Sequence, residues 1–116
     1  MQDFRKLRVW QAASALTTFM YRATGQFPSI ERFALVTQMR TAALSIAANI
    51  AEGAGRGSKK DSKRFLQMAY GSASELVSHC AIAAELGYLS SEHREETGRQ
   101  LDNVSRMLRG LMARLK

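Results

Sequence analysis

Few side chains in this sequence combine the residue types and the spacing that enzyme chemistry needs. Glu75 and His79 lie four residues apart and can share one face of a helix. A dinuclear metal site in a helical bundle needs a Glu-x-x-His pair on each of two helices, and the sequence contains no such pair. The second histidine, His93, is expected in solvent. We therefore predict no metal site, no cofactor and no enzymatic activity.

The single cysteine, Cys80, falls among apolar residues at helical spacing. A thiol nucleophile needs an activating neighbour on its own face, and the adjacent His79 points elsewhere on a helix. The spacing favours a core thiol over a catalytic one. One cysteine cannot form an intramolecular disulfide, no segment reaches the roughly 20 apolar residues of a membrane span, and no apolar signal-peptide run follows the N-terminus. We expect a cytoplasmic protein that does not cross a membrane.

A glycine-rich segment separates two long alanine-rich stretches, with glycine at positions 53, 55 and 57. Its pattern matches neither the dinucleotide-binding nor the Walker nucleotide motif, and it follows a helical pattern rather than a strand. A helix is expected to begin directly after it. The helix N-terminus and the nearby cations would attract an anion; these cations are Arg56, Lys59, Lys60, Lys63 and Arg64. A phosphate-binding loop and a solvated turn remain equal alternatives.

A second group of cations lies near the C-terminus, after the last acidic residue, Asp102. It consists of Arg106, Arg109, Arg114 and Lys116. The formal net charge of the chain is +7, which favours an anionic partner. Aromatic residues that could stack on bases are scarce near both groups, which argues against sequence-specific readout of a nucleic acid.

These residues must be positioned by helices. The chain has 116 residues, 46% of them hydrophobic, and a single proline, which predicts one all-α domain over residues 1–116. Helices are expected over about 3–23, from Pro28 or Ser29 to Glu52 or Gly53, over 59–86, and from Ser90 or Ser91 towards the C-terminus. Short connections make successive helices antiparallel, giving an up-down-up-down four-helix bundle. The N-terminus, the 53–58 loop and the C-terminus then share one end.

Apolar residues in steps of three and four define the predicted core of the bundle. They are Phe4, Leu7, Trp10, Ala13, Leu16 and Met20 in the first helix; Val36, Met39, Ala43, Ile46 and Ile50 in the second; Leu66, Ala69, Ala73, Leu76, Cys80 and Ala83 in the third; and Leu101, Val104, Leu108, Leu111 and Leu115 in the fourth.

Polar side chains form a second stripe beside the apolar core positions of the two central helices. They are Gln38, Ser45, Asn49 and Glu52 in one helix and Ser72 and Glu75 in the other, with Arg40 and Arg56 as additional partners. Polar atoms beside a core are tolerated only when hydrogen-bonded. A structural network that fixes helix register is the favoured interpretation. A subunit interface and, least favoured, a catalytic site remain open.

Several of these motifs resemble one known family over almost the whole chain, from Phe4 to Leu115. They include Leu7-x-Val9-Trp10, the block Gln38-x-Arg40-x-Ala42-x-x-Ser45-Ile46-x-x-Asn49-Ile50-Ala51-Glu52-Gly53, the block Arg64-Phe65-Leu66-x-x-Ala69-x-Gly71-Ser72-x-x-Glu75-Leu76, and Leu86-Gly87-Tyr88-Leu89. The chain is similar to the four-helix-bundle proteins encoded within intervening sequences of bacterial 23S rRNA genes. That family often carries a second basic residue where Thr41 stands.

The resemblance implies an intracellular homopentamer of four-helix bundles without known enzymatic activity. Related bundles are accessory subunits of diversity-generating retroelements, where they engage a reverse transcriptase and nucleic acid. The charge and the resemblance together favour a non-enzymatic oligomeric protein that binds nucleic acid, RNA above all. The alternative is an adaptor whose basic surface docks an acidic protein.

Overall fold

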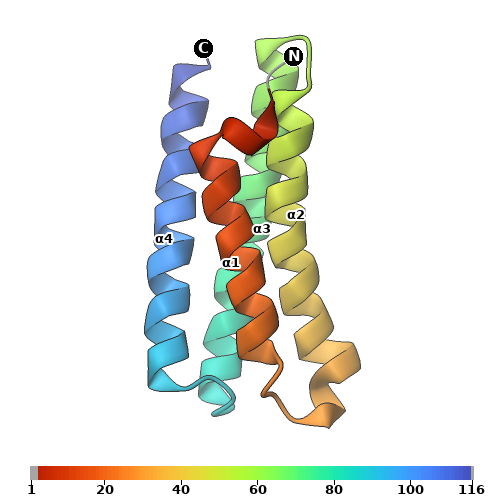
Figure 1. Cartoon of the computed structure of the whole chain (residues 1–116), viewed down its shortest axis with the longest axis vertical. Helices are drawn as coiled ribbons and strands as arrows, with labels where there is room; N and C mark the ends of the chain where they lie inside the picture. Colours follow the sequence, from red (N-terminus) through yellow and green to blue (C-terminus); the bar gives the residue numbers. More distant parts are fainter. Residues whose placement is uncertain (1–2, 116) are drawn as a thin grey trace.

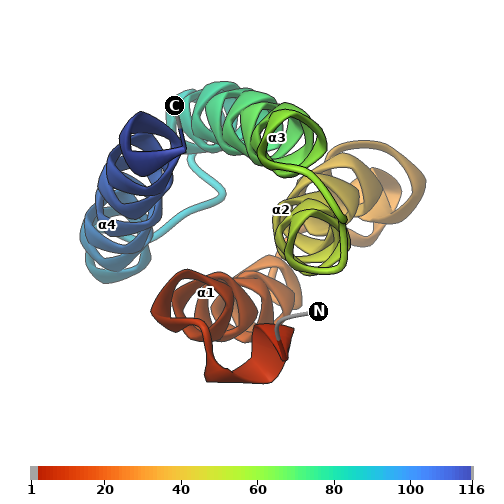
Figure 2. The same cartoon turned by 90° about the horizontal axis from the view of Figure 1, so that it is seen from above.

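The structure is a computed structural model that describes residues 3–115. Four helices run alternately up and down: α1 (Arg8–Thr24), α2 (Thr37–Ala54), α3 (Lys59–Glu85) and α4 (Ser91–Arg114) (Figure 1). The described residues contain no strand. The molecule measures 44 × 23 × 20 Å, and each helix packs against the next while α4 closes the ring against α1 (Figure 2). The predicted all-α antiparallel four-helix bundle is confirmed.

The core lies where the apolar spacing of the last three helices places it. Every predicted core residue of α2 and its first turn is buried, as are those of α3 except Cys80, which is half-buried. In α4 the predicted core residues Leu101, Val104 and Leu108 are buried, whereas Leu111 and Leu115 are only half-buried near the end of the bundle. Thr97, which the apolar pattern did not include, is also buried.

The first helix begins later than expected. A short 3₁₀ turn, η1 (Phe4–Lys6), is capped by Asp3, and Leu7 then adopts an extended backbone before α1 starts at Arg8. This break changes the helix register, so Val9 is buried while Phe4, Leu7 and Trp10 are only half-buried. The stripe predicted from Phe4 onwards is therefore wrong for its first turns and correct from Ala13 to Met20.

The second helix also differs at its start. A 3₁₀ turn, η2 (Ser29–Glu31), and one turn of π-helix, η3 (Arg32–Val36), precede the regular α2. The Thr37 hydroxyl also donates to the carbonyl of Arg32, five residues earlier, at 2.6 Å. This segment projects from the bundle, and it leaves Ile30 and Phe33 exposed to 83% and 88%.

Helix ends follow the capping residues of the sequence. Ser58 and Ser90 each accept a hydrogen bond at 3.1 Å from the backbone N–H three residues on, which caps α3 and α4. Gly87 has a φ of 78°, a left-handed conformation that favours glycine. The N–H groups of Gly87 and Tyr88 donate to the carbonyls of Ala84 and Ala83, so α3 ends in a Schellman motif.

Gly53 sets the distance between α2 and α3 at the loop end. A Cβ on this residue would lie 3.1 Å from the carbonyl oxygen of Ser62 and 3.3 Å from Cβ of Phe65. The Ser62 hydroxyl donates to the carbonyl of Gly53 at 2.8 Å across the same contact. By contrast, a Cβ on Gly98 or Gly110 would meet no atom within 4 Å, so neither glycine is explained by a close backbone approach.

Candidate nucleic-acid interface

Most of the positive charge lies in the half of the bundle that contains the α2–α3 loop, which we call the basic end (Figure 1). Its described cations are Arg5, Lys6, Arg8, Arg56, Lys59, Lys60, Lys63, Arg64, Arg106, Arg109 and Arg114. Its carboxylates are Asp3, Glu52 and Asp61, and Asp102 lies close to the midpoint of α4. Lys116 lies outside the described residues.

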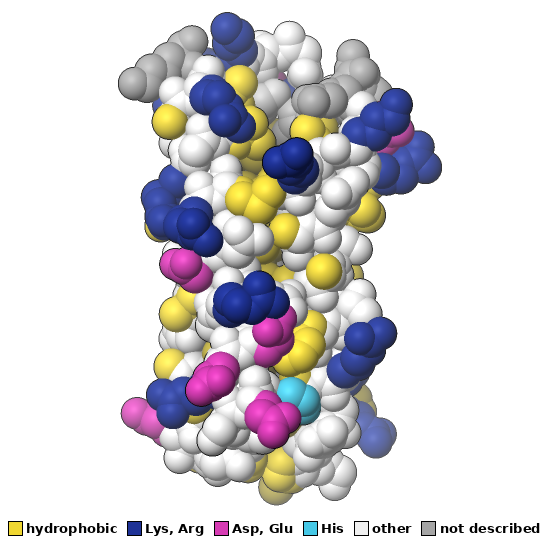
Figure 3. All heavy atoms as spheres, turned by 60° about the vertical axis from the view of Figure 1, so that its left-hand side comes forward, with side chains coloured by type: hydrophobic (Ala, Val, Ile, Leu, Met, Phe, Trp, Pro, Cys, Tyr) yellow, Lys and Arg dark blue, Asp and Glu magenta, His cyan; other side chains and the backbone are white. Residues whose placement is uncertain are grey.

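The opposite half is close to neutral. Its cations are Arg22, Arg32, Arg40, Arg94 and Arg99, and its carboxylates are Glu31, Glu75, Glu85, Glu92, Glu95 and Glu96. On the face that includes α4, Lys and Arg side chains dominate the upper part, while nearly all Asp and Glu side chains gather lower down (Figure 3). The chain is therefore electrostatically polar along its long axis, and the basic end carries the net charge.

Two arginines of the loop region are held against one aromatic ring. The guanidinium carbons of Arg56 and Arg64 lie 4.4 and 4.6 Å from the centre of the Phe65 ring. Arg56 also pairs with Glu52 at 3.0 Å, and Arg64 approaches Asp61 at 3.8 Å. These contacts order the two guanidinium groups, and both side chains keep exposed area for a further ligand.

The three lysines at the start of α3 form no salt bridge with any described residue. Lys59 and Lys60 are exposed and Lys63 is half-buried. They lie in and just after the first turn of α3. There the Asp61 N–H is capped by the Ser58 hydroxyl and the Ser62 N–H donates to the Ser58 carbonyl, which leaves the N–H groups of Lys59 and Lys60 without a partner in the helix. Unpaired ammonium groups beside a helix N-terminus can bind a phosphate without first breaking an ion pair.

The α4 cations continue this surface across the α3–α4 face. The Arg109 guanidinium donates to the Tyr70 hydroxyl at 3.1 Å, which ties the end of α4 to α3. Lys59, Lys63 and Tyr70 recur at helical spacing, so they lie along the side of α3 that faces α4. Arg106 pairs with Asp102 at 3.2 Å, and Arg114 is exposed in the last turn of α4.

The polar stripe divides into separate contacts. Between α2 and α3 the Ser45 and Ser72 hydroxyls are 2.8 Å apart, and the Asn49 amide donates to the Ser45 carbonyl and hydroxyl. Glu75 instead contacts His79 at 3.1 Å on an exposed face of α3. Gln38 is exposed, and no hydrogen bond joins its side chain to another described residue.

Arg40 does not join this stripe, contrary to expectation. Its guanidinium donates to the Thr24 hydroxyl at 2.9 Å and to the Tyr21 carbonyl at 3.1 Å, and it lies 4.5 Å from the centre of the Tyr21 ring. Arg40 therefore ties α2 to the end of α1, because its helical position faces α1 rather than α3. His93 is likewise not fully solvated, since its ring packs edge-on against Phe19 with centroids 5.5 Å apart.

Comparison with known proteins identifies the family of this chain and a similar fold. The profile of the 23S rRNA-intervening sequence protein family matches residues 5–110. The chain belongs to this family. Its fold is similar to the crystal structure of a protein of unknown function from the S23 ribosomal protein family of Bacteroides thetaiotaomicron. The TM-score is 0.81 at 19% identity, with 90% of this chain and 97% of that chain covered. Among curated proteins, none is a significant match.

Two further observations describe what this member of the 23S rRNA-intervening sequence family contains. Among residues 3–115, no helix combines the length and the hydropathy that a bilayer-spanning segment needs. Within the same range, no three His, Cys, Asp or Glu side chains lie close enough together to hold a metal ion.

Sequence reasoning identified the cations of this family member but missed the aromatic residues that hold them. Phe65 contacts the guanidinium groups of both Arg56 and Arg64, and Tyr70 accepts a hydrogen bond from Arg109. The spacing of Tyr70 from Lys63, two helical turns, was the available signal for its place beside the cations. The Phe65 stack could not be predicted, because it depends on how the loop brings Arg56 back over α3.

Proposed function

We propose that this chain is a non-enzymatic, self-associating helical-bundle protein that binds nucleic acid, RNA above all, through its basic end. The observation that carries the proposal is the concentration of the net charge at one end of the bundle. Phosphate contacts supply most of the sequence-independent affinity of proteins for nucleic acids. The family description, which refers to intervening sequences of 23S rRNA, supports RNA over DNA.

The chemistry of the basic end favours recognition of phosphates rather than bases. Its cations are solvent-accessible, whereas Phe65 and Tyr70 are half-buried and engaged by arginines. Base readout would need polar groups or free aromatic faces presented to base edges. We therefore expect affinity for structured RNA with little dependence on sequence.

Filter binding of a structured RNA over a salt series tests the proposal. Affinity should fall steeply as salt increases. Protein binding releases counterions condensed on the RNA, and this release becomes less favourable at higher salt concentration. The double variant Lys59→Glu/Lys60→Glu should bind more weakly, and its salt slope should decrease by about two, one for each lost phosphate contact. Carboxylates in the first turn of a helix interact favourably with the positive end of the helix dipole, so this variant should stay folded.

Arg22→Glu/Arg32→Glu provides the matched control, since it changes the net charge equally at the opposite end of the bundle. Its affinity should change little beyond the small effect of net charge. Equal weakening by both variants, or no RNA binding at about 50 mM salt, a concentration at which phosphate contacts are strong, would overturn the proposal. Recovery of an acidic protein partner after nuclease treatment would instead favour the adaptor function.

Self-association is supported by the outer face of α2. No charged residue occurs in α2 between Arg40 and Glu52, and Leu44 on its outer face is 49% exposed. Surface helices of monomeric proteins normally carry charged residues on the solvent side. We infer that a second copy of the chain covers this face, and a homopentamer is the assembly that the family resemblance implies.

A further inference from the structure

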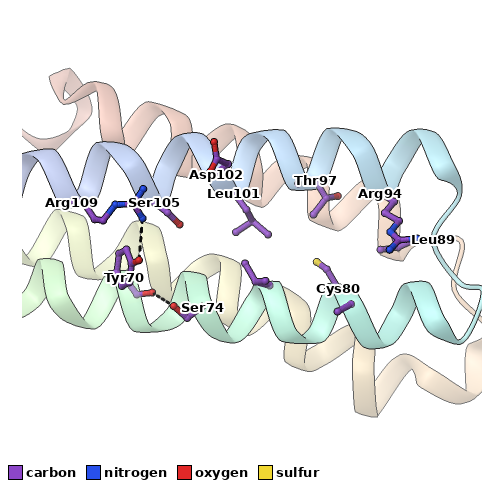
Figure 4. A pocket seen from close by; sticks show the side chains of 13 residues that line it. Tyr70, Ser74, Cys80, Leu89, Arg94, Thr97, Leu101, Asp102, Ser105 and Arg109 are labelled. Carbon is purple, nitrogen blue, oxygen red and sulfur yellow. Dashed lines mark hydrogen bonds between the residues drawn. The ribbon is translucent and has the colours of Figure 1, made fainter.

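A groove between α3 and α4 is unrelated to the loop cations. It has a volume of about 520 Å³, within the range typical of small-molecule sites. Its apolar lining includes Val77, Cys80, Leu89 and Leu101. Arg94 and Leu89 lie at one end and Tyr70 with Arg109 at the other, with the apolar side chains between them (Figure 4).

The groove stays open because the residues along its walls are small. Ser74 and Ala81 line it from α3, and Gly98 and Ser105 from α4. Gly98 is unfavourable inside a helix relative to alanine, and no neighbouring backbone requires it, since a Cβ there would meet no atom within 4 Å. The space that Gly98 leaves is therefore part of the groove.

One polar atom of the groove lacks a partner. The Thr97 side chain lines the groove and is 1% exposed, yet its hydroxyl forms no hydrogen bond with any described residue. Buried hydroxyl groups are normally hydrogen-bonded, because an unpaired one is destabilising. Arg94, one helical turn away, forms no salt bridge with a described carboxylate, whereas Asp102 is paired with Arg106.

Cys80 lies in the middle of the groove lining and is half-buried. Burial raises the pKa of the Cys80 thiol to about 12, so the thiol is neutral at physiological pH. The groove thus combines an apolar middle with an unpaired hydroxyl and an unpaired guanidinium at the Leu89 end. An elongated apolar ligand with one anionic group complements this distribution.

We propose that the α3–α4 groove binds a fatty-acid-like amphiphile, with its hydrocarbon chain over Val77, Cys80 and Leu101 and its anionic head near Arg94 and Thr97. The hydrocarbon chain covers apolar side chains that solvent otherwise contacts. The head group accepts hydrogen bonds from the guanidinium and, after rotation of its side chain, from the Thr97 hydroxyl. The head-group end at Arg94 lies away from the loop cations, and Arg109 of the basic end lines the other end of the groove.

Isothermal titration with dodecanoate below its critical micelle concentration tests the site. The wild-type chain should bind about one equivalent, and Gly98→Leu should abolish binding because the leucine fills the groove without displacing backbone. Gly71→Leu is the matched control. It places the same side chain on α3 outside the groove, again with no atom within 4 Å of Cβ, and it should bind like the wild type.

Two changes test the head group. Dodecanol, which has the same hydrocarbon chain without the charge, should bind about tenfold more weakly than dodecanoate. Arg94→Gln should reduce the affinity for dodecanoate by a similar factor. Thr97→Val should also reduce the affinity for dodecanoate. The melting temperature of the ligand-free variant should stay the same or rise, because an unpaired buried hydroxyl is removed. A purely structural Thr97 would leave the affinity unchanged.

The single cysteine supplies an independent readout. Alkylation of Cys80 by a small maleimide is slow because little thiolate is present, and bound dodecanoate should slow it further in the wild type and in Gly71→Leu. Binding retained in Gly98→Leu, equal affinity for dodecanol and dodecanoate, or no binding at millimolar dodecanoate would each overturn the proposal. RNA binding measured on the same samples is unaffected by these outcomes, so the two proposals fail separately.

Discussion

Gly53 is the residue at which a single methyl group has the clearest structural consequence. Alanine at this position would place Cβ 3.1 Å from a backbone oxygen of α3, which cannot move without shifting the helix. We expect Gly53→Ala to lose about 1 to 2 kcal/mol of unfolding free energy, because overpacking outweighs the gain in helix propensity. Denaturation with guanidinium chloride measures this change.

Gly71→Ala is the control for Gly53→Ala, since its Cβ would meet open space in α3. It should stabilise the protein by up to about 1 kcal/mol through helix propensity alone. A Gly53→Ala variant as stable as Gly71→Ala would show that α2 and α3 do not approach as closely as the structure places them.

Cys80 predicts a pH dependence of stability. Burial raises its pKa to about 12 in the folded chain from the ordinary thiol value of 9.0, so the unfolded chain releases the proton first as pH rises. The contribution of this thiol is therefore fully present below pH 9 and is lost between pH 9 and 12. Between pH 8 and pH 10.5 the unfolding free energy of the wild type should fall by about 2 kcal/mol more than that of Cys80→Ala.

Urea denaturation of the two proteins at both pH values measures this difference. The comparison with Cys80→Ala removes the contribution of lysine and tyrosine titration, which both proteins share. Parallel pH profiles for the two proteins would contradict the buried position of the thiol in the groove.

At the scale of the helices, capping decides where each element begins. Ser58 accepts the Asp61 N–H and starts α3 at the most cationic point of the chain. Ser58→Ala should cost about 1 kcal/mol of stability because one N–H at the helix start loses its acceptor. Ser58→Asp should keep the wild-type stability, since aspartate is an equally good cap. Thermal unfolding followed by circular dichroism distinguishes the two variants.

The same pair connects stability with RNA binding. Ser58→Asp adds a negative charge at the proposed phosphate site, so RNA affinity should fall although the fold is intact. Ser58→Ala should retain most of the affinity at temperatures where the protein is folded. Unchanged RNA binding in Ser58→Asp would place the RNA away from the start of α3.

At the scale of the whole molecule, charge is more unevenly distributed than exposed apolar surface. The cations gather at the basic end, while large exposed apolar side chains occur on α1, η2, η3, α2 and α3. Leu44→Glu places a charge on the uncharged face of α2 without touching the core, because Leu44 is 49% exposed. We expect it to dissociate the assembly, since a buried unpaired charge at an interface is strongly unfavourable.

Sedimentation velocity measures the assembly, with Gln67→Glu, an exposed position on α3, as the control that adds the same charge elsewhere. The wild type and Gln67→Glu should sediment as one oligomer and Leu44→Glu as a smaller species. A monomeric wild type, or an assembly that Leu44→Glu leaves intact, would contradict self-association through α2.

Much of this fold could be predicted from local sequence because the forces involved are short-range. The apolar spacing from Val36 to Ile50 and from Leu66 to Leu76 placed the core correctly, and Ser58, Ser90 and Gly87 marked helix ends through their own backbone interactions. The start of the first helix was predicted wrongly, since a continuous apolar stripe does not reveal the extended residue at Leu7 that shifts the register.

What the sequence by itself determined is the number of helices, most core residues of the last three, and the antiparallel order that puts distant cations at one end. What only the tertiary structure decided is which side chains meet. Arg40 bonds to α1, Arg56 and Arg64 stack on Phe65, and a groove with an unpaired Thr97 remains between α3 and α4. The physical reason is range: periodicity and capping act within one or two helical turns, whereas partners and cavities depend on the distances and rotations between helices.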